Sequence, residues 1–201
     1  DWSSDVCSSD LMTATDGHRI IQSTGGDSNG NIRLVDCSRW TELREAVEYH
    51  ADLAALLEAP TVFRLLNDPG KATGPQQFSI AERGADFIDE DLQTALQTIR
   101  KVSPSGVTPL AEHVREIRAN VVAMKDELSE MGQKVVIVLA TDGLPSNSRG
   151  ISGHAEKAEF QNSLRSLEGL PVWIVIRLCT DEEAVVNYYN DLDSELGTYN
   201  Y

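Results

Sequence analysis

The chain has 201 residues, of which 41% are hydrophobic and 24% charged. This length and composition fit one globular domain with a real core and argue against a disordered chain. Its 32 acidic residues outnumber its 17 basic ones, giving a formal charge of −15, so we expect no nucleic-acid partner, although cations remain possible ligands. The longest apolar runs, at 135–140 and 172–176, are far shorter than the roughly 20 residues that span a bilayer. We therefore expect no membrane insertion.

Three widely separated cysteines form neither a CxxC pair nor an even disulfide framework, which favours a reducing compartment and a cytoplasmic location. Four histidines show no spacing typical of a zinc site. On these grounds neither a disulfide scaffold nor a zinc centre is expected.

Residues 1–11 contain four serines and three aspartates. The string resembles the translated read-through of a sequencing adapter, and it has neither the basic nor the apolar part of a signal peptide. We interpret it as an artefactual segment and exclude it from the fold. Residues 12–40 are polar and turn-rich, so we expect a loop-rich insertion, with a glycine cluster at 25–30 and a short strand at 32–35.

The remaining residues, 41–201, alternate between helical and strand patterns. Residue Thr41 is a plausible N-cap for the first helix, and Gly132 a plausible end for the long third one. This order predicts the α/β class with a mostly parallel sheet. Helices are expected at 41–58, 91–102, 110–131, 155–168 and 181–196, and strands at 61–66, 77–81, 135–140 and 171–178.

The long helix carries an apolar stripe at spacings of three and four residues, which predicts one core-facing side. We expect its methionines to be ordinary core residues. The stripe consists of Leu110, Val114, Ile117, Val121, Met124, Leu128 and Met131.

Two segments place suitable oxygen atoms at one edge of the predicted sheet. Asp142 follows the buried strand at 135–140, and Thr108 stands at the N-cap of the long helix with Pro109 in its first turn. In open parallel sheets, ligands bind beyond the carboxyl ends of the strands. A carboxylate, a hydroxyl and waters are ligands that a hard cation prefers. Each feature alone has an ordinary explanation, as a turn or a helix start.

The segments SGVTPL at 105–110 and VVIVLATDG at 135–143 resemble two elements of the metal-ion-dependent adhesion site of von Willebrand factor type A (VWA) domains. The resemblance implies a doubly wound, Rossmann-like sheet with helices on both faces. It also implies a protein-interaction function, in which a partner donates an acidic side chain to a bound Mg²⁺, Mn²⁺ or Ca²⁺. Carried over by position, the metal ligands are Thr108 and Asp142.

The family's D-x-S-x-S loop is absent. DCSRW at 36–40 places Trp40 where the second hydroxyl belongs, and Asp5 is followed by Cys7 and Ser9. We therefore interpret residues 41–201 as an incomplete VWA-like domain, truncated at its N-terminus, with its first central strand missing. Met12 is then the candidate for the residue that follows the lost motif. The cation is expected only for an intact domain.

No G-x-S-x-G elbow or histidine pair indicates a nucleophile, so we expect no enzyme and no catalytic residues. Two alternatives stay open. One is a metal-dependent phosphoester hydrolase that uses Asp142, with Asp68 and Asp181 as the further acids at strand ends. The other is a VWA-like scaffold without a metal.

Overall fold

The structure is a computed structural model that describes residues 2–6, 10–22 and 32–197. Its mixture of helices and strands confirms the α/β class. Among the described helices, none has the length and apolar character to cross a membrane. The strands are β1 (Trp2–Val6), β2 (Gly17–Gln22), β3 (Ile32–Cys37), β4 (Thr61–Leu65), β5 (Gln77–Ile80), β6 (Val135–Thr141) and β7 (Val172–Leu178). The helices are α1 (Arg39–Leu56), α2 (Ile88–Lys101), α3 (Leu110–Glu130), α4 (His154–Arg165) and α5 (Glu183–Gly197), with 3₁₀ turns η1 (Asp10–Thr13) and η2 (Ala85–Phe87).

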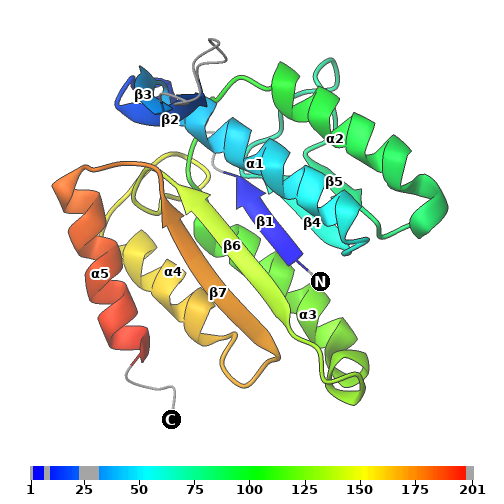
Figure 1. Ribbon diagram of the computed structural model, residues 1–201. Helices are drawn as coiled ribbons and strands as arrows, with labels where there is room; N and C mark the ends of the chain where they lie inside the picture. The colour runs from blue at the N-terminus through cyan, green and yellow to red at the C-terminus, as the bar shows by residue number, and fades with distance from the viewer. Residues whose placement is uncertain (1, 7–9, 23–31, 198–201) are drawn as a thin grey trace.

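Five strands form the main sheet in the order β5-β4-β1-β6-β7 (Figure 1). The pairs β1–β4, β1–β6 and β6–β7 are parallel, and β5 runs antiparallel to β4. Parallel strands end at the same edge of a sheet, so the carboxyl ends of β4, β1, β6 and β7 lie together. The loops that follow them are brought to one place, and the candidate site lies there.

The central strand position is occupied, which corrects our expectation that the first strand is missing. Strand β1 lies between β4 and β6, with Ser4 opposite both Phe63 and Val138. The physical reason is that two neighbouring strands each present backbone N–H and C=O groups that need partners, and this proline-free segment supplies them. The resemblance of residues 1–11 to adapter read-through is not tested by this pairing and stays a prediction.

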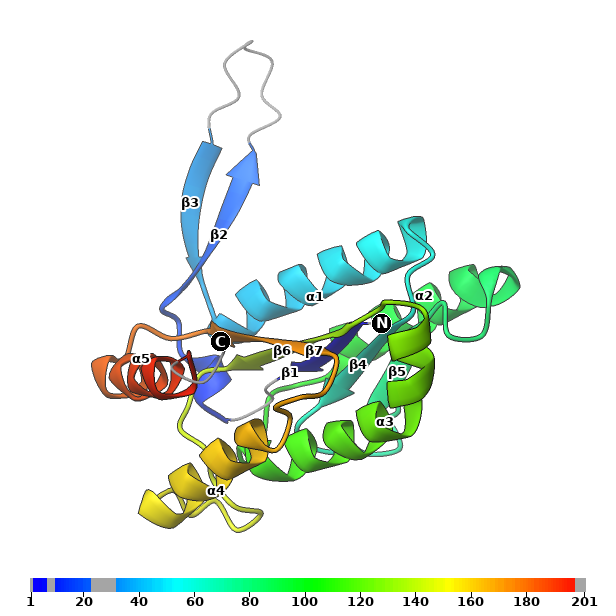
Figure 2. The same cartoon turned by 90° about the horizontal axis from the view of Figure 1, so that it is seen from below.

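The segment 12–40 is more regular than a loop-rich insertion. Strands β2 and β3 pair antiparallel from Gly17 opposite Cys37 to Gln22 opposite Ile32. Figure 2 shows this hairpin projecting away from the main sheet beside the start of α1. The sequence pattern indicated only the second strand. The glycine cluster at 25–30 lies outside the described residues.

Helices cover both faces of the main sheet: α1 lies on one face, and α3 and α4 on the other (Figure 2). Helix α1 begins at Arg39, earlier than predicted, because Ser38 and not Thr41 is its N-cap; the Ser38 Oγ accepts a hydrogen bond from the Thr41 N–H at 3.1 Å. Helix α3 has Pro109 at its N-cap. Thr108, the predicted cap, lies one residue earlier.

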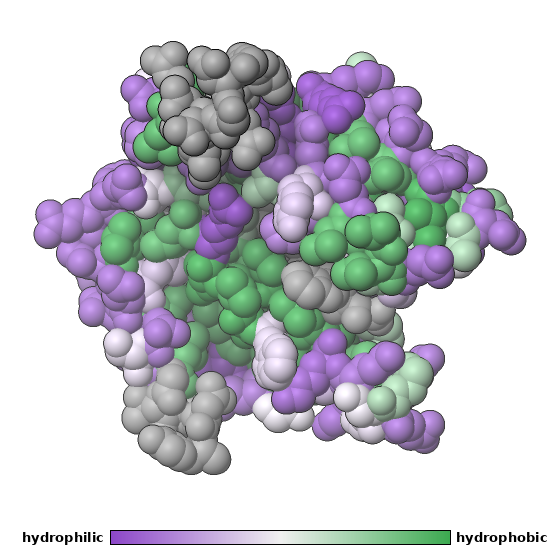
Figure 3. Space-filling model, in the orientation of Figure 1, coloured by the Kyte–Doolittle hydropathy of each residue, from purple (hydrophilic) through white to green (hydrophobic). Residues whose placement is uncertain are grey.

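The core is built around the sheet and the buried sides of these helices. The stripe of α3 is buried as predicted except at its methionines: Met124 is 36% exposed and Met131 53%, so the expectation that they are core residues is wrong. Met12 is instead fully buried. On the face seen in Figure 3, apolar side chains gather over β6 and β7, where Val175 is 49% exposed. The largest fully buried side chains are Phe63, Phe160, Met12, Leu65, Ile80, Ile99, Leu110, Leu128, Ile137, Leu139 and Val114.

Candidate functional site

The loop before α3 and the loop after β6 meet at the carboxyl edge of the main sheet. The backbone N–H of Thr108 donates to the Ser146 Oγ at 2.9 Å, and the backbone N–H of Ser146 donates to the Thr108 carbonyl at 2.9 Å. This reciprocal pair ties Thr108 to the same short loop that contains Asp142. The structure therefore brings the segments of both predicted site residues together.

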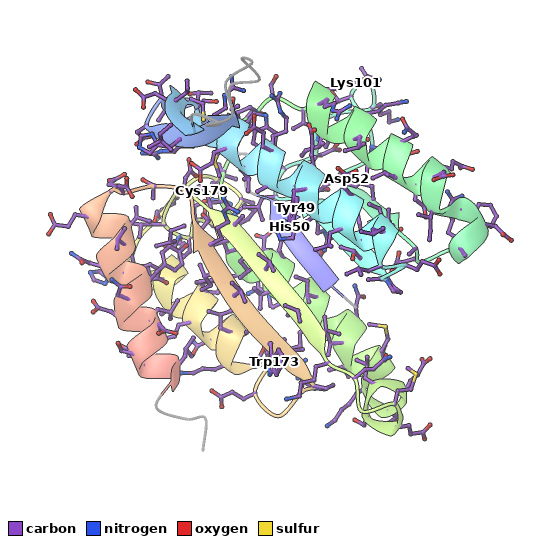
Figure 4. The ribbon with its side chains drawn as sticks, in the orientation of Figure 1. Tyr49, His50, Asp52, Lys101, Trp173 and Cys179 are labelled. Carbon is purple, nitrogen blue, oxygen red and sulfur yellow. The ribbon has the colours of Figure 1, made fainter. Side chains whose placement is uncertain are left out.

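Asp142 directly follows β6 and has no solvent exposure. The turn that holds it is fixed from two sides. The Tyr189 hydroxyl on α5 donates to the Gly143 carbonyl at 3.0 Å, and the Cys179 N–H donates to the Thr141 carbonyl at 2.8 Å. Figure 4 places Cys179 at the carboxyl end of β7, beside the end of β6. The backbone on both sides of Asp142 is thus held by the sheet and by α5 together.

Thr108 is 6% exposed and lies in a loop that a side chain after β4 holds in place. The Asn67 Nδ2 donates to the Val107 carbonyl at 2.8 Å, and the Val107 N–H donates to the Asn67 Oδ1 at 3.2 Å. Gly106 has φ +100°, and a Cβ there would lie 2.6 Å from the Asn67 side chain. Only glycine fits this close approach. Sequence reasoning missed this contact, because Asn67 and Val107 are 40 residues apart in the sequence.

Arg39, the first residue of α1, completes the site. Its Nη1 lies 3.7 Å from the Asp142 Oδ2. Its Nε and Nη2 donate to the two carboxylate oxygens of Asp16 at 2.7 and 2.6 Å. The hydrogen bond from Arg39 holds the pKa of Asp16 below its ordinary value, and the same bond raises the pKa of Arg39. One guanidinium therefore faces the carboxyl groups of both Asp16 and Asp142.

Sequence reasoning missed Arg39 as a site residue. The string at 36–40 was weighed only as an imperfect D-x-S-x-S loop, which directed attention to its hydroxyl and not to its arginine. The structure divides that string between the end of β3, the N-cap Ser38 and the first turn of α1. The one available signal was a basic residue at the start of a helix, where the helix dipole favours acids.

The oxygen ligands present at this edge suit a hard cation. The Asp142 carboxylate and the Thr108 hydroxyl are ligands of the type that Mg²⁺, Mn²⁺ and Ca²⁺ take, and Mg²⁺ in particular keeps several waters. Over the described parts of the chain, no group of three or more His, Cys, Asp or Glu side chains is placed to hold a metal. The guanidinium of Arg39 already lies beside the buried Oδ2 of Asp142.

The other acids considered at strand ends are on the surface. Asp68 is exposed and its Oδ1 accepts a hydrogen bond from the Gly70 N–H at 2.8 Å, which closes a local turn. Asp181 is also exposed. In the loop after β6, the Ser152 hydroxyl donates to the Pro145 carbonyl at 2.8 Å, so it stabilises the loop.

His113 on α3 is packed close to the site and is neutral in the fold. Its Nε2 lies 2.9 Å from the Leu66 carbonyl oxygen; a carbonyl only accepts, so this nitrogen carries the hydrogen. Burial lowers the pKa of His113, and the charge of Arg64 lowers it further. The hydrogen bond to Leu66 and the charges of Glu116 and Glu112 raise this pKa, but they do not outweigh burial. The folded protein therefore resists protonation of this ring.

We expect the stability of the chain to fall as pH drops below about 6.5, the ordinary pKa of histidine in an unfolded chain. Below that pH the unfolded state binds a proton at His113 and the folded state does not, so acid favours unfolding by at most about 1.4 kcal/mol per pH unit. His113→Gln keeps an N–H donor for Leu66 and does not titrate. Urea unfolding at pH 7 and pH 5 should show a smaller loss for the variant, and equal losses would contradict the assignment.

No protein-family model matches this chain, and no curated protein matches its sequence. At the carboxyl edge of the sheet, two loops hold Asp142 and Thr108, and Arg39 of α1 lies beside Asp142.

Proposed function

We propose that this chain is a protein-interaction domain of the VWA type, and that it binds an acidic side chain of its partner through a divalent cation at the carboxyl edge of its sheet. The observation that carries the proposal is the reciprocal hydrogen bonding of Thr108 and Ser146. It holds the two segments that resemble the family's adhesion site against each other.

The strand order supports the same location. From the central strand β1 the chain fills one side of the sheet with β4 and β5, and it then fills the other side with β6 and β7. Ligands in open α/β sheets bind where the strand order reverses, beyond the carboxyl ends. That point lies between β1 and β6, and Asp142 directly follows β6. A doubly wound architecture with helices on both faces is the proposal that this order favours.

The proposed division of labour follows from the side chains. Asp142 and Thr108 would hold the cation, with waters in its other positions. A bound divalent cation supplies positive charge for a carboxylate of the partner. Asn67 keeps the Thr108 loop in place through its two hydrogen bonds to Val107. The sequence predicted a cation only for an intact domain. Because β1 occupies the central strand position while the D-x-S-x-S loop is absent from the sequence, we propose that this chain has a weak cation site.

Coordination fits the site better than turnover. Asp68 and Asp181, the further acids of the hydrolase alternative, lie exposed. We therefore place the chain among binding domains.

A titration with Mn²⁺, followed by electron paramagnetic resonance of the free ion, tests the proposal. We expect a dissociation constant of roughly 10⁻⁴–10⁻³ M, the range of weak oxygen-ligand sites. Asp142→Asn should weaken binding at least about tenfold, since it removes the one formal charge among the ligands. The chain carries a charge of −15 and attracts cations non-specifically, so Asp68→Asn serves as the control and should bind like the wild type.

Equal Mn²⁺ binding by the wild type and Asp142→Asn would refute the cation site. A separate measurement tests whether a partner's acidic side chain binds through the cation. A short peptide with one aspartate should bind the chain only when Mn²⁺ is present, and the same peptide with asparagine should not bind. Binding of both peptides without Mn²⁺ would point to a site that needs no cation.

A further inference from the structure

Arg39 has a place in this site that the proposed function does not explain. A carboxylate that is removed from water needs a counter-charge, because burying an uncompensated charge is costly. The side chains of Asp142 and Arg39 are 0% and 9% exposed, and 3.7 Å separates the nearest nitrogen and oxygen. The buried carboxylate is thus already compensated by a residue of the chain itself.

The base of the β2–β3 hairpin holds this guanidinium in position. Asp16 immediately precedes β2, and Arg39 follows β3 after a single residue, Ser38. The backbone approaches so closely there that a Cβ on Gly17 would lie 2.9 Å from the carbonyl carbon of Ser38. The Arg39 N–H also donates to the Ala14 carbonyl at 3.0 Å. Helix α1 and the hairpin therefore aim the guanidinium at Asp142.

Asp16 is a second carboxylate partner of the Arg39 guanidinium, in addition to Asp142. It bonds two nitrogens of Arg39, and its side chain is 49% exposed. A bidentate pair of this kind is among the stronger side-chain contacts. Arg39 can therefore leave Asp142 and keep its pairing with Asp16, so release from Asp142 does not leave the guanidinium unpaired.

We propose that Arg39 is a built-in competitor for the divalent cation: it occupies Asp142 until the cation displaces it, and its existing pairing with Asp16 retains the displaced guanidinium. This inference rests on the proposed function and adds to it what regulates the site. Two positive charges within about 4 Å of one carboxylate repel each other strongly, so the guanidinium and the cation exclude each other. The site's affinity for the cation is then set by Arg39 as well as by the ligands.

The competition predicts opposite effects for two substitutions, measured by the Mn²⁺ titration. Arg39→Met removes the competitor and should tighten binding at least about tenfold. Asp16→Asn removes the alternative partner of the guanidinium, so Arg39 stays on Asp142 and binding should weaken. Arg177→Met is the matched control. It changes the net charge as Arg39→Met does, but Arg177 pairs with Glu42 at 3.3 Å, and binding should change by less than about threefold.

Arg39→Lys keeps the experiment decisive if Arg39→Met does not fold. Lysine keeps the positive charge but cannot bond two oxygens of Asp16 and also reach Asp142 as the planar guanidinium does, so it should bind Mn²⁺ more tightly than the wild type. Tightening in either Arg39 variant, with Arg177→Met unchanged, supports the competition. If the wild type binds Mn²⁺ through Asp142 and neither Arg39 variant binds more tightly, the competition is overturned and the proposed function stands. If neither the wild type nor the folded Arg39 variants bind Mn²⁺, the proposed function falls, and the competition falls with it.

Discussion

Ser4→Pro is expected to destroy the cooperative unfolding of this chain. Ser4 is the middle residue of β1 and pairs with Phe63 of β4 on one side and Val138 of β6 on the other. Proline has no N–H to donate and is excluded from central strands. We expect a loss of at least about 3 kcal/mol, typical of a proline that breaks a backbone hydrogen bond inside a regular element. That loss is a large part of the free energy of unfolding of a typical domain, which is roughly 5–15 kcal/mol.

Ser4→Ala is the control, because it keeps the backbone N–H and should change the free energy of unfolding by less than about 1 kcal/mol. Urea unfolding followed by circular dichroism measures both variants. If Ser4→Pro melts like the wild type, β1 is not a central strand, and residues 2–6 do not contribute to the fold. That result would favour the interpretation of residues 1–11 as an extraneous segment.

Arg39→Met should be the most damaging single substitution at the site. It leaves the Asp142 carboxylate buried without the guanidinium that now lies 3.7 Å away. Breaking a buried ion pair by removing one partner costs about 3–5 kcal/mol, whereas removing both charges can be nearly neutral. The double variant Arg39→Met/Asp142→Asn should therefore recover most of the stability lost in Arg39→Met.

Urea unfolding of the wild type, the two single variants and the double variant, in a buffer with a metal chelator, gives the coupling free energy of the pair. We expect at least about 1 kcal/mol, as is usual for residues in direct contact. Arg177→Met, which removes a half-exposed arginine, should lose far less stability than Arg39→Met. A coupling energy near zero would mean that Arg39 and Asp142 do not compensate each other.

The parts of the fold that could be predicted are those with local sequence patterns. The continuous apolar run at 135–140 became β6 (Val135–Thr141), and the stripe at 110–131 became α3 (Leu110–Glu130). Strand β1 could not be predicted in this way, because its sequence is WSSDV, with neither an apolar run nor a strong β preference. Its conformation follows from the backbone pairing that β4 and β6 provide, and such tertiary effects override local preference in strands.

The residues of the candidate site also differ in whether a local sequence pattern indicates them. Thr108 and Asp142 could be predicted as candidates because each stands at a recognisable junction, at a helix start and at a strand end, and because their segments resemble the VWA adhesion site. Arg39, Asp16 and Asn67 could not be identified, because each acts through contacts with residues distant in the sequence. The methionines of α3 were misjudged because a periodic stripe shows which side of a helix is apolar, but not how far the rest of the fold covers it.

Nuclear magnetic resonance of the ¹⁵N-labelled chain with trace Mn²⁺ tests the central claim most directly, because the paramagnetic ion broadens the amide signals nearest to it. The account predicts the earliest broadening at the amides of Thr108, Asp142 and Gly143, and the loss of this pattern in Asp142→Asn. Broadening that begins at the acidic surface stretches 89–91 or 181–183, and is unchanged in Asp142→Asn, would contradict a cation site at the carboxyl edge of the sheet.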